Sequence, residues 1–321
     1  MFKLLAIALV AVSSSFAQDI PQQDRVRVDE FYRLAAQLQD SIWPAWSKTP
    51  APLLLVTPEA EYLFHHPNPP PDFKNTANTW SRPRQFSTNL LATFPAFGPP
   101  SVIVIGEPQN TDVKKSTPWL FVVMHEHFHQ LQNDQPCYFQ SVEQLGLSKG
   151  DKTGMWMLNY PFPYDKSEIV RGFAHLRDLL LRVLSESDES KMKDLARQYV
   201  SERKKVMAQL SPDDHKYFSF QLWQEGIARY TQIKAAEAAA KYIPSSNFQH
   251  LPDYEPIASY ASHVRADTLA ELKDADLSTW KRTFIYPFGA AEGLLLDRQH
   301  PGWQSEYFKH LFTTDALFDL R

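Results

Sequence analysis

Three histidines and a glutamate crowd into the segment HEHFH, residues 125–129 of a 321-residue chain. In a helix, residues four apart lie one turn apart on the same side, so His125 and His129 form a pair and His127 points away from it. Two imidazoles placed in this way can bind one Zn²⁺, and Glu126 can then take a proton from a water on the metal. The segment therefore predicts a metal site with a hydrolytic reaction.

The helix that carries this motif is expected over residues 118–133. Thr117 and Pro118 are typical of a helix start, since a hydroxyl can cap the helix and proline suits its first position. We expect His127 to be a packed or supporting residue rather than a ligand. The face that packs into the core is expected to consist of Leu120, Phe121, Met124, Phe128 and Leu131.

A catalytic zinc site needs a third protein ligand. Glu225 is the first candidate, because it borders the apolar stripe of a helix expected over residues 214–243 and a carboxylate there needs a partner. Gly226 directly after it allows two helices to approach closely. Two alternatives stay open. Glu225 could instead pair with Arg229 on a surface face, or Glu168 could bind the metal in its place.

Three segments together resemble the gluzincin group of zinc metallopeptidases: HEHFHQ at residues 125–130, EGIARY at 225–230 and FIYPFGAAEGLLL at 284–296. The last is similar to the Y-x-x-G-A stretch of the aminopeptidase-like members. The resemblance covers roughly residues 116–298. It implies a zincin-like fold, one zinc ion and a peptide or protein substrate.

The same resemblance implies a role for each site residue. His125, His129 and Glu225 are the expected zinc ligands, and Glu126 is the expected general base. Tyrosines of this group stabilise the oxyanion of the transition state, and Tyr286 is the first choice for that role. Tyr230 is the second choice.

Other zincin classes do not fit the chain. Gln132 and Gln135 stand where the metzincin pattern requires glycine and histidine, and residues 148–150 lack the glutamate that thermolysin-like spacing requires. Two further functions stay open beside the peptidase. One is a non-catalytic exported binding protein on a gluzincin scaffold, and the other is a zinc hydrolase of non-peptide amides or esters.

The first residues, MFKLLAIALVAVSSSFAQD, predict a signal peptide over residues 1–17 with cleavage after Ala17. The apolar run Leu4–Val12 is too short to span a bilayer, and no later stretch is long and apolar enough. We therefore expect export to a periplasm or out of the cell, with no transmembrane segment after cleavage. Cys137 is the only cysteine, which excludes an intramolecular disulfide, and we expect it to be buried.

Strand-like segments precede helical ones, which predicts an α+β fold. An N-terminal α/β part is expected over residues 18–115 and a helical, zincin-like catalytic part over 116–321, unless 18–321 is one continuous domain. The formal charge of −4 indicates no nucleic-acid partner, and the oligomeric state is not specified. Strands are expected within residues 52–57, 61–66, 85–94 and 99–108, and further helices at 24–46, 166–184, 189–209, 256–273 and 288–298.

Two further features are expected near the site. The strand at residues 102–105 could pair with an extended peptide substrate by β-addition, or it could be an interior strand with no free edge. The proline-rich loop at residues 65–80 is expected to wall the cleft.

Overall fold

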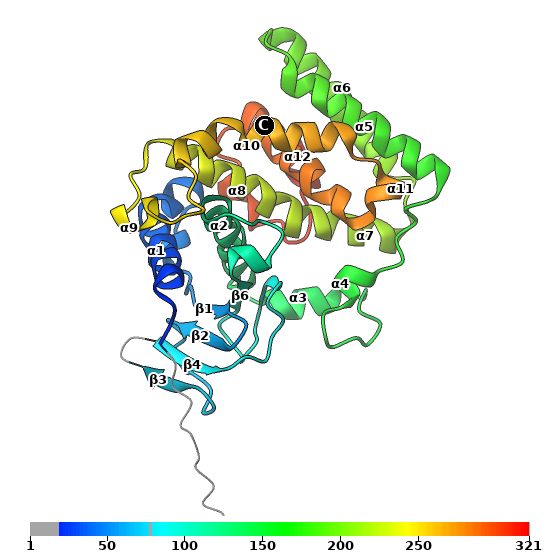
Figure 1. Ribbon diagram of the computed structural model, residues 1–321. Coiled ribbons are helices and arrows are strands. Elements are labelled where there is room, and N and C mark those ends of the chain that lie inside the picture. Colours follow the sequence, from blue (N-terminus) through cyan, green and yellow to red (C-terminus); the bar gives the residue numbers. More distant parts are fainter. Residues whose placement is uncertain (1–18, 77–78, 321) are drawn as a thin grey trace, which may run out of the picture.

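The computed structural model describes residues 19–76 and 79–320, so the predicted signal peptide lies outside the described residues. A mixed β-sheet in the N-terminal part is followed by a mainly helical region, which confirms the predicted α+β class. Figure 1 shows the sheet at one end of the molecule and the helices gathered above it, with α5 and α6 forming a hairpin that projects from the body.

The strands are β1 (Leu53–Val56), β2 (Ala60–Phe64), β3 (Lys74–Thr76), β4 (Thr79–Pro83), β5 (Leu91–Phe94) and β6 (Val102–Gly106). The helices are α1 (Gln22–Ile42), α2 (Ser116–Asn133), α3 (Tyr138–Gln144), α4 (Trp156–Asn159), α5 (Ser167–Ser185), α6 (Glu189–Met207), α7 (Pro212–Gln221), α8 (Ile227–Ala238), α9 (Ser246–Gln249), α10 (Ile257–Asp274), α11 (Leu277–Trp280), α12 (Ile285–Gln299) and α13 (Gln304–Tyr307). Shorter helical turns are η1 (Trp46–Lys48), η2 (Pro108–Asn110), η3 (Leu222–Gly226), η4 (Ala239–Lys241), η5 (Lys281–Phe284) and η6 (Asp315–Asp319).

The strand order in the sheet is β3-β4-β2-β1-β6-β5, and only β1 and β6 pair in parallel. Alternate residues of a strand point to opposite faces. Leu53, Leu55, Ile103 and Ile105 belong to the main core beneath the helices. The residues between them pack into a second apolar cluster on the other face. The central strands are buried on both faces, which explains their unbroken apolar runs.

The position of β6 settles one choice left open by the sequence. β6 lies between β1 and β5, so it has no free edge and cannot accept an added strand. The edge strand on this side is β5. The expected loop at residues 65–80 is wrong in part, because residues 74–76 and 79–83 form β3 and β4 at the opposite edge of the sheet.

Helix α2 lies between the sheet and the helices, and all the residues expected on its core face are buried. The indole of Trp119 donates to the carbonyl of Gly106 at the end of β6, with an N···O distance of 2.8 Å. The expected cap is wrong: the helix begins at Ser116 after Lys115, and the Thr117 hydroxyl donates to the carbonyl of Glu255 instead. The Thr117 hydroxyl therefore makes a tertiary hydrogen bond instead of capping the helix.

The single helix expected over residues 214–243 is broken into segments. α7 and α8 are separated by η3, a π-helical turn in which the amide of Ile227 bonds the carbonyl of Leu222, five residues back. Such turns are rare and occur frequently at functional sites. Glu225 lies inside this turn.

A buried carboxyl pair lies where α1 meets the segment after β6. Burial and the neighbouring Asp24 charge raise the pKa of Glu107 to about 7, and Asn110 donates to the Glu107 carboxylate with an N···O distance of 2.8 Å. The folded chain therefore binds a proton more tightly than the unfolded chain between about pH 4.5 and 7. Stability from this group is present below that window and is lost as the pH rises through it.

We expect Glu107→Gln, which resembles the protonated form, to leave stability at pH 4 near the wild-type value and to raise it at pH 8. Urea unfolding of both chains across this range measures the difference. A difference in stability that does not vary with pH would contradict the assignment.

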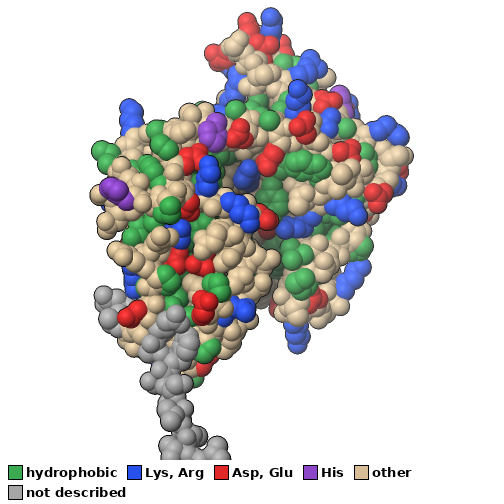
Figure 2. Space-filling view, viewed as in Figure 1, with side chains coloured by type: hydrophobic (Ala, Val, Ile, Leu, Met, Phe, Trp, Pro, Cys, Tyr) green, Lys and Arg blue, Asp and Glu red, His purple; other side chains and the backbone are tan. Residues whose placement is uncertain are grey.

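The surface carries charges of both signs. On the face in Figure 2, lysines and arginines alternate with aspartates and glutamates and do not gather into one patch. Among residues 19–76 and 79–320, no helix is both long and apolar enough to cross a membrane. Cys137 is exposed, so its expected burial is wrong. It precedes α3 with a φ of 61°, in the short connection after α2.

Candidate metal centre

The two paired histidines of α2 direct their Nε2 atoms at one another, 3.1 Å apart. Both rings are buried, as is Glu126. One ligand atom from each of His125, Glu126 and His129 lies within 4.8 Å of the other two. This group could hold a metal ion.

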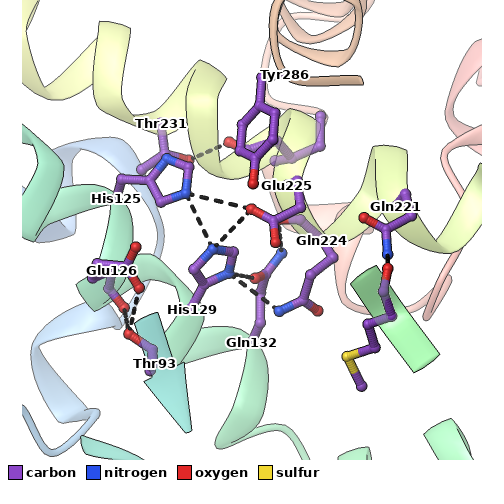
Figure 3. Close-up of polar contacts among 12 residues, drawn as sticks. Thr93, His125, Glu126, His129, Gln132, Gln221, Gln224, Glu225, Thr231 and Tyr286 are labelled. Carbon is purple, nitrogen blue, oxygen red and sulfur yellow. Dashed lines mark hydrogen bonds and ion pairs between the residues drawn. The ribbon is translucent and has the colours of Figure 1, made fainter. Parts of the chain in front are cut away.

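The π-helical turn brings a carboxylate from a distant segment to the same point. Glu225 Oε2 lies 3.6 Å from His125 Nε2 and 3.4 Å from His129 Nε2 (Figure 3). The Glu225 side chain keeps 18% of its surface exposed, so the cluster reaches solvent on this side. The alternative pairing with Arg229 is wrong, because that guanidinium binds Glu271 and Gln232.

A second layer of polar groups lies beyond Glu225. The guanidinium of Arg282 is 3.5 Å from Glu225 Oε1 and donates to the hydroxyl oxygen of Tyr286 with an N···O distance of 2.9 Å. Arg282 also donates to Gln221 Oε1, and Figure 3 shows the Tyr286 hydroxyl directed at the Glu225 carboxylate. Because the tyrosine oxygen accepts from Arg282, its own proton is free to be donated elsewhere.

A residue of the β-sheet holds the Glu126 side chain in place. The hydroxyl of Thr93 in β5 lies 2.8 Å from Glu126 Oε2 and 3.0 Å from the Glu126 carbonyl oxygen. The contact orients the carboxylate beside the histidine pair (Figure 3). It also places the edge strand of the sheet next to the cluster.

The pKa values of the two histidines and of Glu225 depend on burial and on one another's charges. Burial lowers the pKa of His125. Burial also acts to lower the pKa of His129, but the adjacent Glu225 charge prevails and raises it to about 9. Burial acts to raise the pKa of Glu225, and the charge of His129 prevails and holds it well below its usual value. Glu225 is therefore an anion that favours a positive charge between itself and the two rings.

Two glycines let the carboxylate approach. A Cβ added at Gly226 would lie 2.7 Å from the Cα of Gly289, and one added at Gly289 would lie 2.5 Å from the Cα of Gly226. The backbones of η3 and α12 thus touch directly. The nearest atoms belong to the backbone, which cannot move aside as the end of a flexible side chain can. This contact fixes both Glu225 and the helix that carries Tyr286.

We expect Gly289→Ala to lower the free energy of unfolding by about 1–3 kcal/mol through overpacking, despite the better helix propensity of alanine. Gly172→Ala in α5 is the matched control, because its Cβ would meet only the side chain of Val206, at 3.0 Å. Urea unfolding of the three chains measures the difference. Equal stability of the two variants would show that the contact between the two glycines does not constrain the helices.

Several residues considered in the sequence lie away from the cluster. The Tyr230 hydroxyl donates to Asp297 and accepts from Gln304, so the structure does not place it among the contacts of the histidine pair. Glu168 is a surface residue paired with Lys166 at 2.9 Å, and the structure does not place it among the contacts of the histidine pair.

His127 is packed, as expected. Its ring stacks on Trp46, with a centroid distance of 4.9 Å, and Nδ1 lies 2.8 Å from Gln130 Oε1. It belongs to the contact between α1 and α2 rather than to the cluster.

Sequence reasoning missed the supporting residues. Arg282 stands four residues before Tyr286, a spacing that can be read from the sequence once the tyrosine is chosen. Gln132 stands three residues after His129 on the same side of α2, which is a similar local signal. Thr93 gives no such signal, because its contact with Glu126 depends on how the sheet packs against α2.

Comparison of the chain with models of known protein families, with curated proteins and with solved structures finds no match. The geometry of the cluster is therefore the basis for assigning a function.

Proposed function

We propose that the protein is a zinc-dependent metallopeptidase of the gluzincin type, with a zincin-like fold and with His125, His129 and Glu225 as zinc ligands. The observation that carries the proposal is the convergence of two imidazole nitrogens and one carboxylate oxygen from distant segments. Glu126 is the proposed general base and Tyr286 the proposed oxyanion donor. Each of these roles is supported by a contact described above.

The spacing of the three donor atoms supports zinc. Donors that lie 2.0–2.1 Å from a zinc ion at tetrahedral angles are separated from each other by about 3.3 Å. The three separations here are 3.1, 3.4 and 3.6 Å. Two imidazole lone pairs that face each other at such a distance repel unless a proton or a cation lies between them. Two histidines and one glutamate form a donor set that catalytic zinc sites use.

Zinc held by this set would act as a Lewis acid and lower the pKa of a coordinated water to about 7. Glu126 lies beside the histidine pair but outside the three proposed ligands, where it accepts the proton of the attacking water and later returns it to the leaving amine. The Thr93 hydroxyl keeps the Glu126 carboxylate in place. The hydroxyl of Tyr286 donates to the oxyanion that develops on the substrate carbonyl, and Arg282 holds the tyrosine oxygen as an acceptor.

The free edge of β5 supports a peptide as substrate. The carbonyl of Leu90 accepts from the amide of Gly106, which fixes the alternation of the β5–β6 ladder. Leu91 and Thr93 therefore direct their backbone groups away from β6, toward the free edge. An extended peptide added there would run past Glu126, which Thr93 contacts. Export through the signal peptide at residues 1–17 stays part of the proposal.

The test is hydrolysis of a defined peptide mixture, followed by mass spectrometry, with zinc-loaded and chelator-treated protein. We expect cleavage by the zinc-loaded chain, loss of cleavage after chelation, and recovery on adding zinc back. A zinc-loaded chain that cleaves no peptide would contradict the proposal and support a non-catalytic binding protein. Cleavage of small esters or amides without peptide cleavage would support the non-peptide hydrolase.

A further inference from the structure

Gln132 is a fully buried side chain that contacts both halves of the candidate metal centre. Its Oε1 lies 2.6 Å from Nδ1 of His129. Its Nε2 lies 3.0 Å from the carbonyl oxygen of Trp223, 3.1 Å from that of Gln224 and 2.8 Å from the hydroxyl of Tyr307. One amide group thus joins α2 to the turn η3 that carries Glu225.

These partners fix the orientation of the amide and the tautomer of His129. Two carbonyl oxygens can only accept, so the nitrogen of Gln132 must face them and its oxygen must face the histidine. When His129 is neutral, as a metal ligand must be, its proton therefore resides on Nδ1, and Nε2 is the nitrogen that presents a lone pair to the metal. The Gln224 amide nitrogen lies 3.2 Å from the same Nδ1. A protonated Nδ1 cannot accept from it, so the bond to Gln132 is the one that the proton makes.

The carbonyls that Gln132 binds belong to the π-helical turn. A helix that returns from i→i+5 to i→i+4 bonding skips a carbonyl, and a buried carbonyl needs a partner. The amide of Gln132 supplies a donor inside this turn, and the Tyr307 hydroxyl supplies a second one to Trp223, with an O···O distance of 2.5 Å. The irregular turn that aims Glu225 at the histidines is thus stabilised from α2 itself.

We infer that Gln132 is a positioning residue for metal binding, which sets the tautomer of His129 and holds the π-helical turn that presents Glu225. The inference rests on the proposed metal site but not on the proposed reaction. A residue that hydrogen-bonds to a metal-binding side chain contributes to metal affinity, because a side chain in the wrong orientation must reorient before it can bind the metal.

The same helix provides a matched control. Gln130 is also buried, its Oε1 lies 2.8 Å from Nδ1 of His127, and its Nε2 donates to the carbonyls of Pro52 and Ser101. It makes the same kinds of bond as Gln132, but its histidine is not a proposed ligand. Substituting Gln132 therefore removes hydrogen bonds that connect to the metal centre, whereas substituting Gln130 removes equivalent hydrogen bonds that do not.

The experiment compares Gln132→Met with Gln130→Met. Zinc affinity is measured by competition with a chromophoric chelator, and the thermal midpoint is measured on the metal-free chains. We expect both variants to unfold at lower temperature, because each removes hydrogen bonds that a buried amide donates to backbone carbonyls. We expect zinc affinity to fall about 10- to 100-fold in Gln132→Met only.

Equal zinc affinity in the two variants would overturn the inference and leave the metal site standing. A wild-type chain that binds no zinc would overturn the proposed metal site and this inference together. Should Gln132→Met fail to fold, Gln132→Asn keeps a buried amide that is too short to reach both helices. Its affinity is then expected to fall by several-fold, and unchanged affinity would count against the inference.

Discussion

Replacing Glu126 with glutamine is expected to lower kcat/KM for peptide hydrolysis by about 10²- to 10⁴-fold, the usual contribution of a general base. The amide cannot accept a proton from the attacking water, yet it keeps the shape of the carboxylate and a contact for the Thr93 hydroxyl. Because Glu126 is not one of the proposed ligands, zinc content is expected to stay at the wild-type value. Peptide cleavage rates and metal analysis of the same preparations measure both quantities.

Thr93→Val is the control for this prediction. It removes the hydroxyl that lies 2.8 Å from Glu126 Oε2 but leaves the carboxylate itself. Its activity is expected to lie between those of the wild-type chain and Glu126→Gln. Two results would contradict the assignment: full activity in Glu126→Gln, or loss of zinc from it, since the second would make Glu126 a ligand.

Replacing Glu225 with glutamine is expected to weaken zinc binding by more than the 100-fold or so that losing a supporting residue costs. The substitution preserves the size of the side chain but removes the only proposed anionic ligand. It also leaves Arg282, whose Nη1 lies 3.5 Å from Glu225 Oε1, without its partner charge. Chelator competition measures the affinity, and hydrolysis is expected to disappear with the metal.

Glu168→Gln is the matched control, since it removes an acidic charge from the surface residue that was the rival ligand. It is expected to bind zinc like the wild-type chain. Wild-type zinc affinity in Glu225→Gln together with reduced affinity in Glu168→Gln would reverse the assignment of the third ligand.

The half of the site on α2 could be predicted from the sequence because it is local. A spacing of four residues in a helix places His125 and His129 on one side whatever the rest of the chain does. The apolar residues expected on the core face of the same helix are buried in the structure, but the histidine face is buried as well, because α2 lies between the sheet and the other helices. The α+β class followed from the order of strand-like and helical patterns in the same way.

The position of Glu225 depends on contacts between distant segments, which no local sequence pattern shows. A regular helix was expected around Glu225, whereas the chain forms a π-helical turn that is stabilised by Gln132 and Tyr307 from distant segments. The sheet order is likewise long-range, because β1 pairs in parallel with β6 across the intervening strands. These pairings decide that β5 is the edge strand beside Glu126.

The central claim is that His125, His129 and Glu225 bind one zinc ion. The most direct measurement is an anomalous diffraction map at the zinc absorption edge from crystals of the zinc-loaded protein. We expect one peak about 2.0–2.2 Å from Nε2 of both histidines and from a carboxylate oxygen of Glu225. A map with no peak at this position, or a peak bound by the histidines while Glu225 stays paired with Arg282 and away from the metal, would contradict it.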